Sequence, residues 1–140
     1  MFCQFSESGT INGLNITVME REVISIENGK MFIPGNVEIW MTQHEIADLM
    51  QCFVAKVNAN VRSILKSGVL DETKVCRTHT YKNGNSVELY NLEMIIALAF
   101  RIRSYNADAF REFIVRKVIA ETLASQIFVY NNWNQGLVLN

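Results

Sequence analysis

The chain has 140 residues, of which 49% are hydrophobic and 19% charged, and its net charge is −1. These proportions exclude an intrinsically disordered chain and are typical of one globular domain with a single core. No apolar run reaches the roughly 18 to 20 residues of a membrane span, and the first residues lack the pattern of a signal peptide. Three scattered cysteines do not form a disulfide framework, so we expect a cytoplasmic protein.

The positive charge is concentrated in one segment. Residues 1–50 contain two basic and seven acidic residues, whereas residues 51–82 contain six basic and two acidic ones. Lys and Arg contacts to phosphates supply much of the affinity of proteins for DNA, so residues 51–82 are the candidate for such contacts. Six basic residues in a segment of this length are not rare, and charge alone leaves an ordinary solvated surface equally open.

The first forty residues predict β structure. Residues 1–12 have few apolar anchors and are expected to be disordered, whereas residues 13–40 are expected to be β-rich. Within them, residues 22–27 combine alternating apolar positions with β-branched residues, and Asn28-Gly29 is a strong signal for a two-residue hairpin turn.

A short helix is predicted to begin at Thr42. Thr42 and Glu45 have the spacing of a capping box, in which each side chain accepts a hydrogen bond from a backbone N–H of the first turn. Thr42 and Gln43 stand at the helix N-terminus, where side chains and N–H groups commonly contact a phosphate. The apolar stripe that must face the core consists of Ile46, Leu49 and Met50.

A second helix is predicted over residues 54–67, with Gly68 at its end. One face is apolar, and the other is basic, polar or small, which is typical of the recognition helix of a helix-turn-helix. Alanine lets the backbone approach a groove, Asn can pair with adenine, and Lys or Arg with guanine or phosphate. Helical hairpins in enzymes and adaptor domains share the same outline, which leaves an interaction module as the alternative. The outward residues and their flanks are Ala55, Lys56, Asn58, Ala59, Asn60, Arg62, Ser63 and Lys66.

The turn between the two helices departs from the usual helix-turn-helix. Gln51 stands where a glycine would relieve a left-handed backbone conformation. Phe53 stands where Ser or Thr would usually cap the second helix, and we expect its ring to pack instead. These departures leave the angle of the second helix open.

A second hairpin at about residues 78–90 follows, with Asn83-Gly84 as its turn. It takes the place of a wing, a β-ribbon that follows the DNA backbone, with Lys82 and Asn83 at its tip. Residues 41–90 are therefore expected to form a winged helix-turn-helix within a single α+β domain.

Two helices are predicted to close the chain, at about residues 92–103 and 107–129, with Asn91 and Asn106 as N-caps. The second is rich in apolar residues and is a candidate homodimer interface. The tail of residues 131–140 has no clear state. The four arginines at 101, 103, 111 and 116 could bind an anion, but we expect them to form surface ion pairs with Glu93, Asp108 and Glu112.

A series of short motifs runs in order through about residues 38–118. They are Trp40-Met41-Thr42-Gln43, Ile46-Ala47, Gly68-Val69-Leu70, Tyr90-Asn91-Leu92-Glu93, Phe100-Arg101-Ile102-Arg103-Ser104 and Phe110-Arg111-Glu112-Phe113. This series resembles the RhuM-type virulence protein family of bacteria. The resemblance implies a helix-turn-helix protein that binds double-stranded DNA, as a transcriptional regulator does.

An enzyme is not expected, because the residues form no catalytic constellation. His44 is expected on an exposed helix face, and Cys76-x-x-His79 is half of a zinc motif without a second half. Neither a Gly-rich phosphate loop nor a nucleophile elbow is present in the sequence. We therefore expect no catalytic residue, no metal, no cofactor and no small-molecule substrate.

Overall fold

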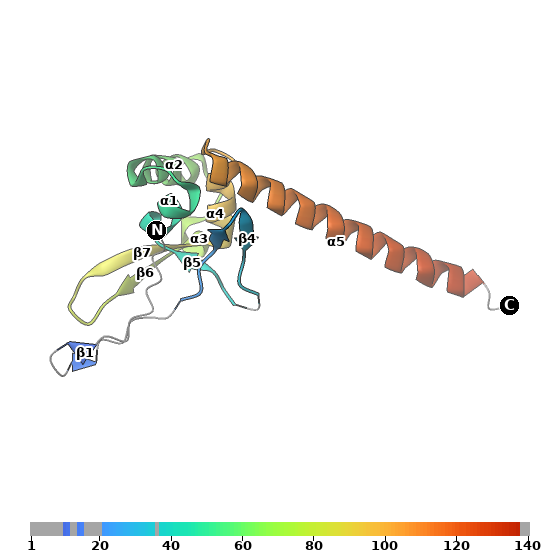
Figure 1. The fold of residues 1–140 in the computed structure, drawn as a ribbon, viewed down its shortest axis with the longest axis horizontal. Coiled ribbons are helices and arrows are strands. Elements are labelled where there is room, and N and C mark those ends of the chain that lie inside the picture. Colours follow the sequence, from blue (N-terminus) through green and yellow to red (C-terminus); the bar gives the residue numbers. More distant parts are fainter. Residues whose placement is uncertain (1–9, 12–13, 16–20, 36, 138–140) are drawn as a thin grey trace.

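Five helices and seven short strands form a mixed α+β fold over the described residues of the computed structural model (Figure 1). The structure describes residues 10–11, 14–15, 21–35 and 37–137, with side chains for residues 21–35 and 37–126. The expected α+β class is confirmed. In chain order the elements are β1 (Thr10–Ile11), β2 (Leu14–Asn15), β3 (Ser25–Glu27), β4 (Lys30–Phe32), β5 (Trp40–Met41), α1 (Gln43–Met50), α2 (Val54–Ser67), α3 (Glu72–Val75), β6 (Cys76–Thr80), β7 (Ser86–Asn91), α4 (Leu92–Ala99) and α5 (Tyr105–Leu137).

The N-terminal segment contains short antiparallel strand pairs. β3 and β4 pair around Asn28 and Gly29, whose φ angles are 50° and 73°. A two-residue hairpin turn of this kind requires positive φ at both positions, and Asn-Gly tolerates it well, so the predicted hairpin is confirmed. Most of residues 1–12, where we expect disorder, lie outside the described residues. Thr10 and Ile11, which are described, form β1 and pair with β2.

A three-stranded antiparallel sheet joins the region before α1 to the hairpin after α3. Its strand order is β5-β7-β6, with Trp40 opposite Asn91 and Met41 opposite Tyr90. The predicted hairpin is therefore present as β6 and β7. Because β5 pairs with β7 and leads directly into α1, the sheet connects the hairpin to the start of the helical pair. The short helix α3, which the sequence analysis did not predict, leads into β6 and is capped by the Asp71 carboxylate.

The α1–α2 pair has the predicted bounds and buries the predicted faces. Thr42 caps α1 with both hydrogen bonds of the capping box, and α2 ends at Gly68 in the left-handed conformation, with φ 73°. Helix α4 packs against α2 and completes the core. The side chains buried between these helices are Ile46, Ala47, Leu49, Met50, Val57, Val61, Ile64, Met94, Ile95, Leu98 and Ala99.

In the turn between α1 and α2, the backbone of Gln51 is as predicted, whereas the side chain of Phe53 is not. Gln51 ends α1 in the left-handed region with φ 50°, as its position implies. The prediction that Phe53 packs is wrong, because its side chain is 84% exposed. Met50 and Val57, both fully buried, belong to the core between the helices, whereas Phe53, at the N-cap of α2, lies outside it.

The two C-terminal helices are present, but with other bounds than predicted. Helix α4 ends at Ala99 rather than near residue 103, and Asn91 caps it as expected. Helix α5 begins at Tyr105, and the Ser104 hydroxyl accepts a hydrogen bond from the Ala107 N–H at 3.0 Å. The prediction of Asn106 as the N-cap is therefore wrong, because its amide instead donates to the Leu49 carbonyl at 2.8 Å.

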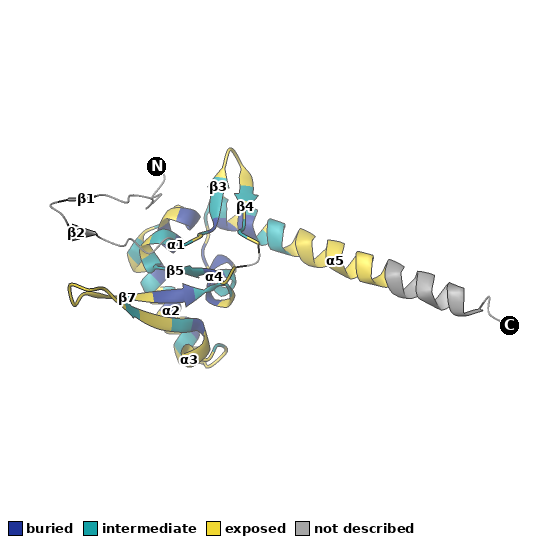
Figure 2. Cartoon of the chain, turned by 90° about the horizontal axis from the view of Figure 1, so that it is seen from below, coloured by how far each residue is buried: buried dark blue, intermediate teal, exposed yellow. Residues whose placement is uncertain are grey.

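Helix α5 is longer than predicted and extends away from the rest of the fold (Figures 1 and 2). It continues to Leu137, so the tail predicted to have no clear state is helical over residues 131–137. Its first turns are anchored by Ala107 and Phe110, which are fully buried, whereas the side chains of residues 115–126 are all exposed. Within the described residues, no helix combines the length and the apolar character needed to cross a bilayer.

Candidate nucleic-acid interface

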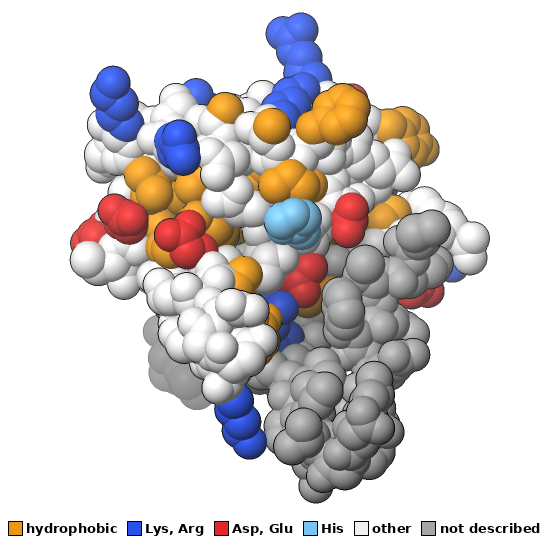
Figure 3. All heavy atoms as spheres, turned by 90° about the vertical axis from the view of Figure 1, so that its left-hand side faces the viewer, with side chains coloured by type: hydrophobic (Ala, Val, Ile, Leu, Met, Phe, Trp, Pro, Cys, Tyr) orange, Lys and Arg blue, Asp and Glu red, His pale blue; other side chains and the backbone are white. Residues whose placement is uncertain are grey.

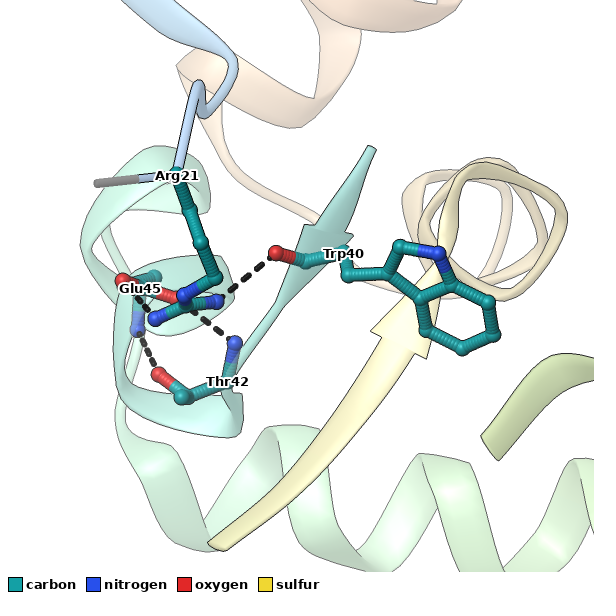
Figure 4. Close-up of polar contacts among 4 residues, drawn as sticks. All are labelled: Arg21, Trp40, Thr42 and Glu45. Atoms are coloured by element: carbon teal, nitrogen blue, oxygen red, sulfur yellow. Dashed lines mark hydrogen bonds and ion pairs between the residues drawn. The ribbon is translucent and has the colours of Figure 1, made fainter. Parts of the chain in front are cut away.

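The start of α1 is fixed by a capping box that an arginine reinforces (Figure 4). The Thr42 hydroxyl accepts from the Glu45 N–H at 3.2 Å, and the Glu45 carboxylate accepts from the Thr42 N–H at 2.7 Å. Arg21 pairs with the other Glu45 oxygen at 2.9 Å and donates to the Trp40 carbonyl at 2.8 Å. Both charged side chains are only 17% exposed, so water weakens this ion pair less than it would a surface pair. The Thr42 side chain thus serves the helix start.

A chain of polar side chains connects α2, α1 and the hairpin. The Asn58 amide donates to the Gln43 carbonyl oxygen at 3.0 Å, and the Gln43 amide donates to the Tyr90 hydroxyl, also at 3.0 Å. That hydroxyl donates to the Glu88 carboxylate at 2.7 Å. Burial and the neighbouring Glu88 raise the pKa of Tyr90 well above its ordinary value, so the phenol stays a donor. Two predicted site residues, Gln43 and Asn58, therefore fix the position of α2 relative to β7.

The outward face of α2 is open, as predicted. Ala55, Lys56, Ala59, Arg62, Ser63 and Lys66 are all exposed. The sequence from residue 51 to residue 70 contains three basic residues and no acidic one. On the side of the molecule in Figure 3, most basic side chains stand along the upper edge, over α2, and the acidic ones lie lower. This face therefore carries a local positive charge that the net charge of the chain conceals.

Arg101 adds a fourth cation to this face. The ion pair expected for it is absent among the described residues, where it contacts polar side chains of α2 instead. Its Nε donates to the Asn60 side-chain oxygen at 3.2 Å, and its Nη2 donates to the Ser63 hydroxyl at 2.8 Å. Asn60 in turn donates to the Lys56 carbonyl at 2.9 Å. A guanidinium has five N–H donors, so Arg101 keeps others for an anion. Predicted ion pairs are present elsewhere, between Arg111 and Asp108 and between Arg116 and Glu112.

The tip of the β6–β7 hairpin exposes the other two predicted site residues. Lys82 and Asn83 are both exposed, and the Asn83 side chain accepts from the Asn85 N–H at 3.0 Å. Gly84 has φ 87°, a conformation that favours glycine. At the base of the hairpin, the Arg77 guanidinium lies 4.2 Å from the centre of the Trp40 ring. The tip is therefore polar and basic, and its base is anchored to β5.

The two histidines and the two described cysteines, Cys52 and Cys76, carry no evident chemistry. Among residues whose placement is described, no three His, Cys, Asp or Glu side chains lie close enough to hold a metal ion. His44 is exposed, and His79 makes an edge contact with the Tyr81 ring. Cys52 and Cys76 are half-buried, and burial raises the pKa of each thiol, which makes it less reactive.

No protein-family model matches the chain, and searches of curated proteins and of solved structures found no match either. A function for this surface must therefore be argued from its geometry and charge.

Proposed function

We propose that this chain binds double-stranded DNA as a winged helix-turn-helix, with α2 in the major groove and the β6–β7 hairpin as the wing. The observation that carries the proposal is the outward face of α2. It combines Lys56, Arg62 and Lys66 with two exposed alanines on a helix whose opposite face is buried. A helix of this kind can enter a major groove, because small residues permit a close approach and cations neutralise phosphates.

The side chains around α2 have two different roles in this proposal. Lys56, in the first turn of α2, and Arg62, near its middle, are suited to base edges or to the nearest phosphates. Lys66, one turn further along, and Arg101, beside Asn60 and Ser63, are suited to the phosphate backbone. Arg101 is held in place before any ligand arrives, so less conformational entropy is lost on binding.

The wing is positioned by the same contacts that position α2. The polar chain from Asn58 through Gln43 and Tyr90 to Glu88 runs from α2 to β7. A fixed angle between helix and hairpin lets Lys82 and Asn83 reach the backbone beside the groove that α2 occupies. Thr42 and Gln43, at the start of α1, support this arrangement through their hydrogen bonds within the protein. The free N–H groups of that helix end are suited to contact a phosphate.

The motifs from Trp40 to Phe113 support the same proposal, because they resemble the RhuM-type virulence protein family of bacteria. On this proposal the protein acts in the bacterial cytoplasm as a regulator of transcription, without catalysis of its own.

A salt titration tests the proposal. Fluorescently labelled random-sequence duplex DNA is titrated with the full chain at several salt concentrations, and anisotropy reports binding. If Lys56, Arg62, Lys66 and Arg101 each neutralise a phosphate, the slope of log K against log salt is about −3 to −4. Absence of binding at about 50 mM salt contradicts the proposal.

A second candidate function is self-association without DNA binding, and helix α5 favours it. Val115, Val118, Ile119 and Leu123 are each about half exposed, at 46 to 59%, and their spacing of three or four residues places them on one side of the helix. Most helical stability in proteins comes from the packing of an amphipathic face, and the side chains of residues 115–126 are exposed. A second copy of the chain would cover this stripe with the same stripe, as in a two-fold symmetric dimer. Sedimentation velocity at several protein concentrations distinguishes monomer from dimer.

A further inference from the structure

The side chain of Phe53 neither caps helix α2 nor packs into the core. Its side chain is 84% exposed, the highest value among the large apolar side chains of the described region. It occupies the N-cap of α2, where its carbonyl accepts from the Lys56 N–H at 2.9 Å, but its side chain makes no capping hydrogen bond. Serine or aspartate at this position would stabilise the helix by about 1 kcal/mol. Stability of the free protein therefore does not explain a phenylalanine here.

The residues on either side of Phe53 favour a role in ligand binding. Two residues earlier, Gln51 holds a left-handed backbone with φ 50°, which is unfavourable for a side chain of its kind. Three residues later, Lys56 begins the basic face of α2. Departures from local preference of this sort concentrate at functional sites. The ring is therefore presented at the helix end that, on the proposed function, is nearest the bases.

We infer that Phe53 reads the C5-methyl group of a thymine in the major groove. This inference rests on the proposed function, in which α2 is the recognition helix. The N-terminal residues of such a helix contact base edges, and among the bases of ordinary DNA only thymine presents a methyl group there. A phenyl ring has no hydrogen-bonding group to offer, so its contribution is apolar contact, while Lys56 and Arg62 supply the polar contacts.

Deoxyuridine tests the inference, because it differs from thymidine only by that methyl group. A tightly bound sequence is first selected from a random duplex library with the full chain. Each thymine of that sequence is then replaced in turn by deoxyuridine, and the dissociation constant is measured for the wild type and for Phe53→Ala. Phe32→Ala is the matched control, because Phe32 is also exposed, at 68%, but lies on β4, in the N-terminal hairpin.

We expect the wild type and Phe32→Ala to bind about fourfold more weakly when one or two particular thymines lose the methyl group. Phe53→Ala should bind the thymine and deoxyuridine duplexes equally, with unchanged thermal stability, because the exposed ring supports no core. DNA binding without any dependence on thymine methyl groups overturns the inference and leaves the proposed function standing. Equal methyl dependence in the wild type and Phe53→Ala also overturns it. Failure to select any DNA overturns both together.

Discussion

The two longest helices of the described chain, α2 and α5, leave different kinds of surface open to solvent. The outward face of α2 is basic and polar, with Lys56, Arg62 and Lys66 between small residues. The part of α5 that extends away from the fold is exposed (Figure 2), and it carries an apolar stripe centred on Val118 and Ile119. The first surface suits a polyanion, and the second suits another apolar helix.

The two surfaces also differ in how they are held. Contacts from α1, β7 and the α4–α5 turn fix α2, so its side chains are arranged before a ligand binds. The polar contacts described for the distal half of α5 join residues of α5 itself, as when the Thr122 hydroxyl donates to the Val118 carbonyl at 2.8 Å. A preorganised surface gains affinity because little order is lost on binding. If the proposed dimer forms, the stripe on α5 gains stability when the partner covers it.

Reversing charge on α2 should have the largest effect. In Lys56→Glu/Arg62→Glu, two phosphate contacts become repulsions, and we expect DNA affinity to fall by about 100-fold or more at low salt. Thermal stability should change little, since both side chains are exposed. The control Lys30→Glu/Lys117→Glu has the same change of charge on β4 and α5. Equal losses in the two double variants would mean that net charge, and not the face of α2, controls binding.

Placing charge on the stripe of α5 should have the next largest effect. Ile119→Glu/Leu123→Glu puts carboxylates on the proposed dimer contact, and we expect the dimer dissociation constant to rise at least about tenfold. Sedimentation velocity measures it. The control Ala120→Glu/Ala124→Glu adds the same charges on the opposite side of the same exposed segment. A wild type that stays monomeric at about 100 μM would refute the dimer.

Interrupting the chain of polar side chains from Asn58 to Glu88 should lower the stability of the protein. Tyr90→Phe removes the hydroxyl that joins Gln43 to Glu88, and we expect a loss of about 1–2 kcal/mol in the free energy of unfolding. Tyr81→Phe is the control, since Tyr81 is 44% exposed on the hairpin. Calorimetry should show a lower melting temperature for Tyr90→Phe alone.

Because the pKa of Tyr90 is raised, the difference in the free energy of unfolding between the wild type and Tyr90→Phe should depend on pH. Above about pH 10 an unfolded tyrosine ionises while the buried one stays neutral, which favours unfolding. The stabilisation by the Tyr90 hydroxyl should therefore be complete below about pH 10 and decrease above it. The difference in stability between the wild type and Tyr90→Phe should narrow at high pH. A constant difference would mean that the phenol titrates normally.

Removing Arg101 should weaken DNA binding moderately. We expect Arg101→Ala to lower affinity by about three- to tenfold and to reduce the magnitude of the salt slope by about one, because one phosphate contact is lost. Arg103→Ala, two residues along and also exposed, is the matched control. If both variants behave alike, the contacts of Arg101 with Asn60 and Ser63 have no role in binding.

The parts of the fold that could be predicted from the sequence are those with local signals. The capping box at Thr42, the glycine at 68 and the Asn28-Gly29 turn act within a few residues, and each lies where predicted. The outward face of α2 followed from helical periodicity alone. The function assigned to that face stays a prediction.

Other features depend on contacts between distant segments, which periodicity does not reveal. Arg21 meets Glu45 across 24 residues, and Arg101 meets Asn60 across 41. Phe53 lies outside the core that includes Met50 and Val57, and its place depends on how the two helices pack against the rest of the fold. The end of α5 was misjudged because the apolar pattern weakens after residue 129, whereas no proline interrupts the helix.

The smallest expected effect concerns the turn between α1 and α2. Gln51→Gly relieves the left-handed conformation, and we expect the free energy of unfolding to rise by up to about 1 kcal/mol, partly offset by the greater freedom of glycine in the unfolded chain. DNA affinity should stay within about twofold of the wild type, because the hydrogen bonds of Asn58 and Arg101, and not the turn, hold α2 in place. The control for stability is Lys66→Gly, in the last turn of α2, which shows the ordinary cost of glycine in a helix. A gain in stability accompanied by a large loss of DNA binding would show that the strain at Gln51 itself orients α2, and that the rigidity of its surface originates in the turn.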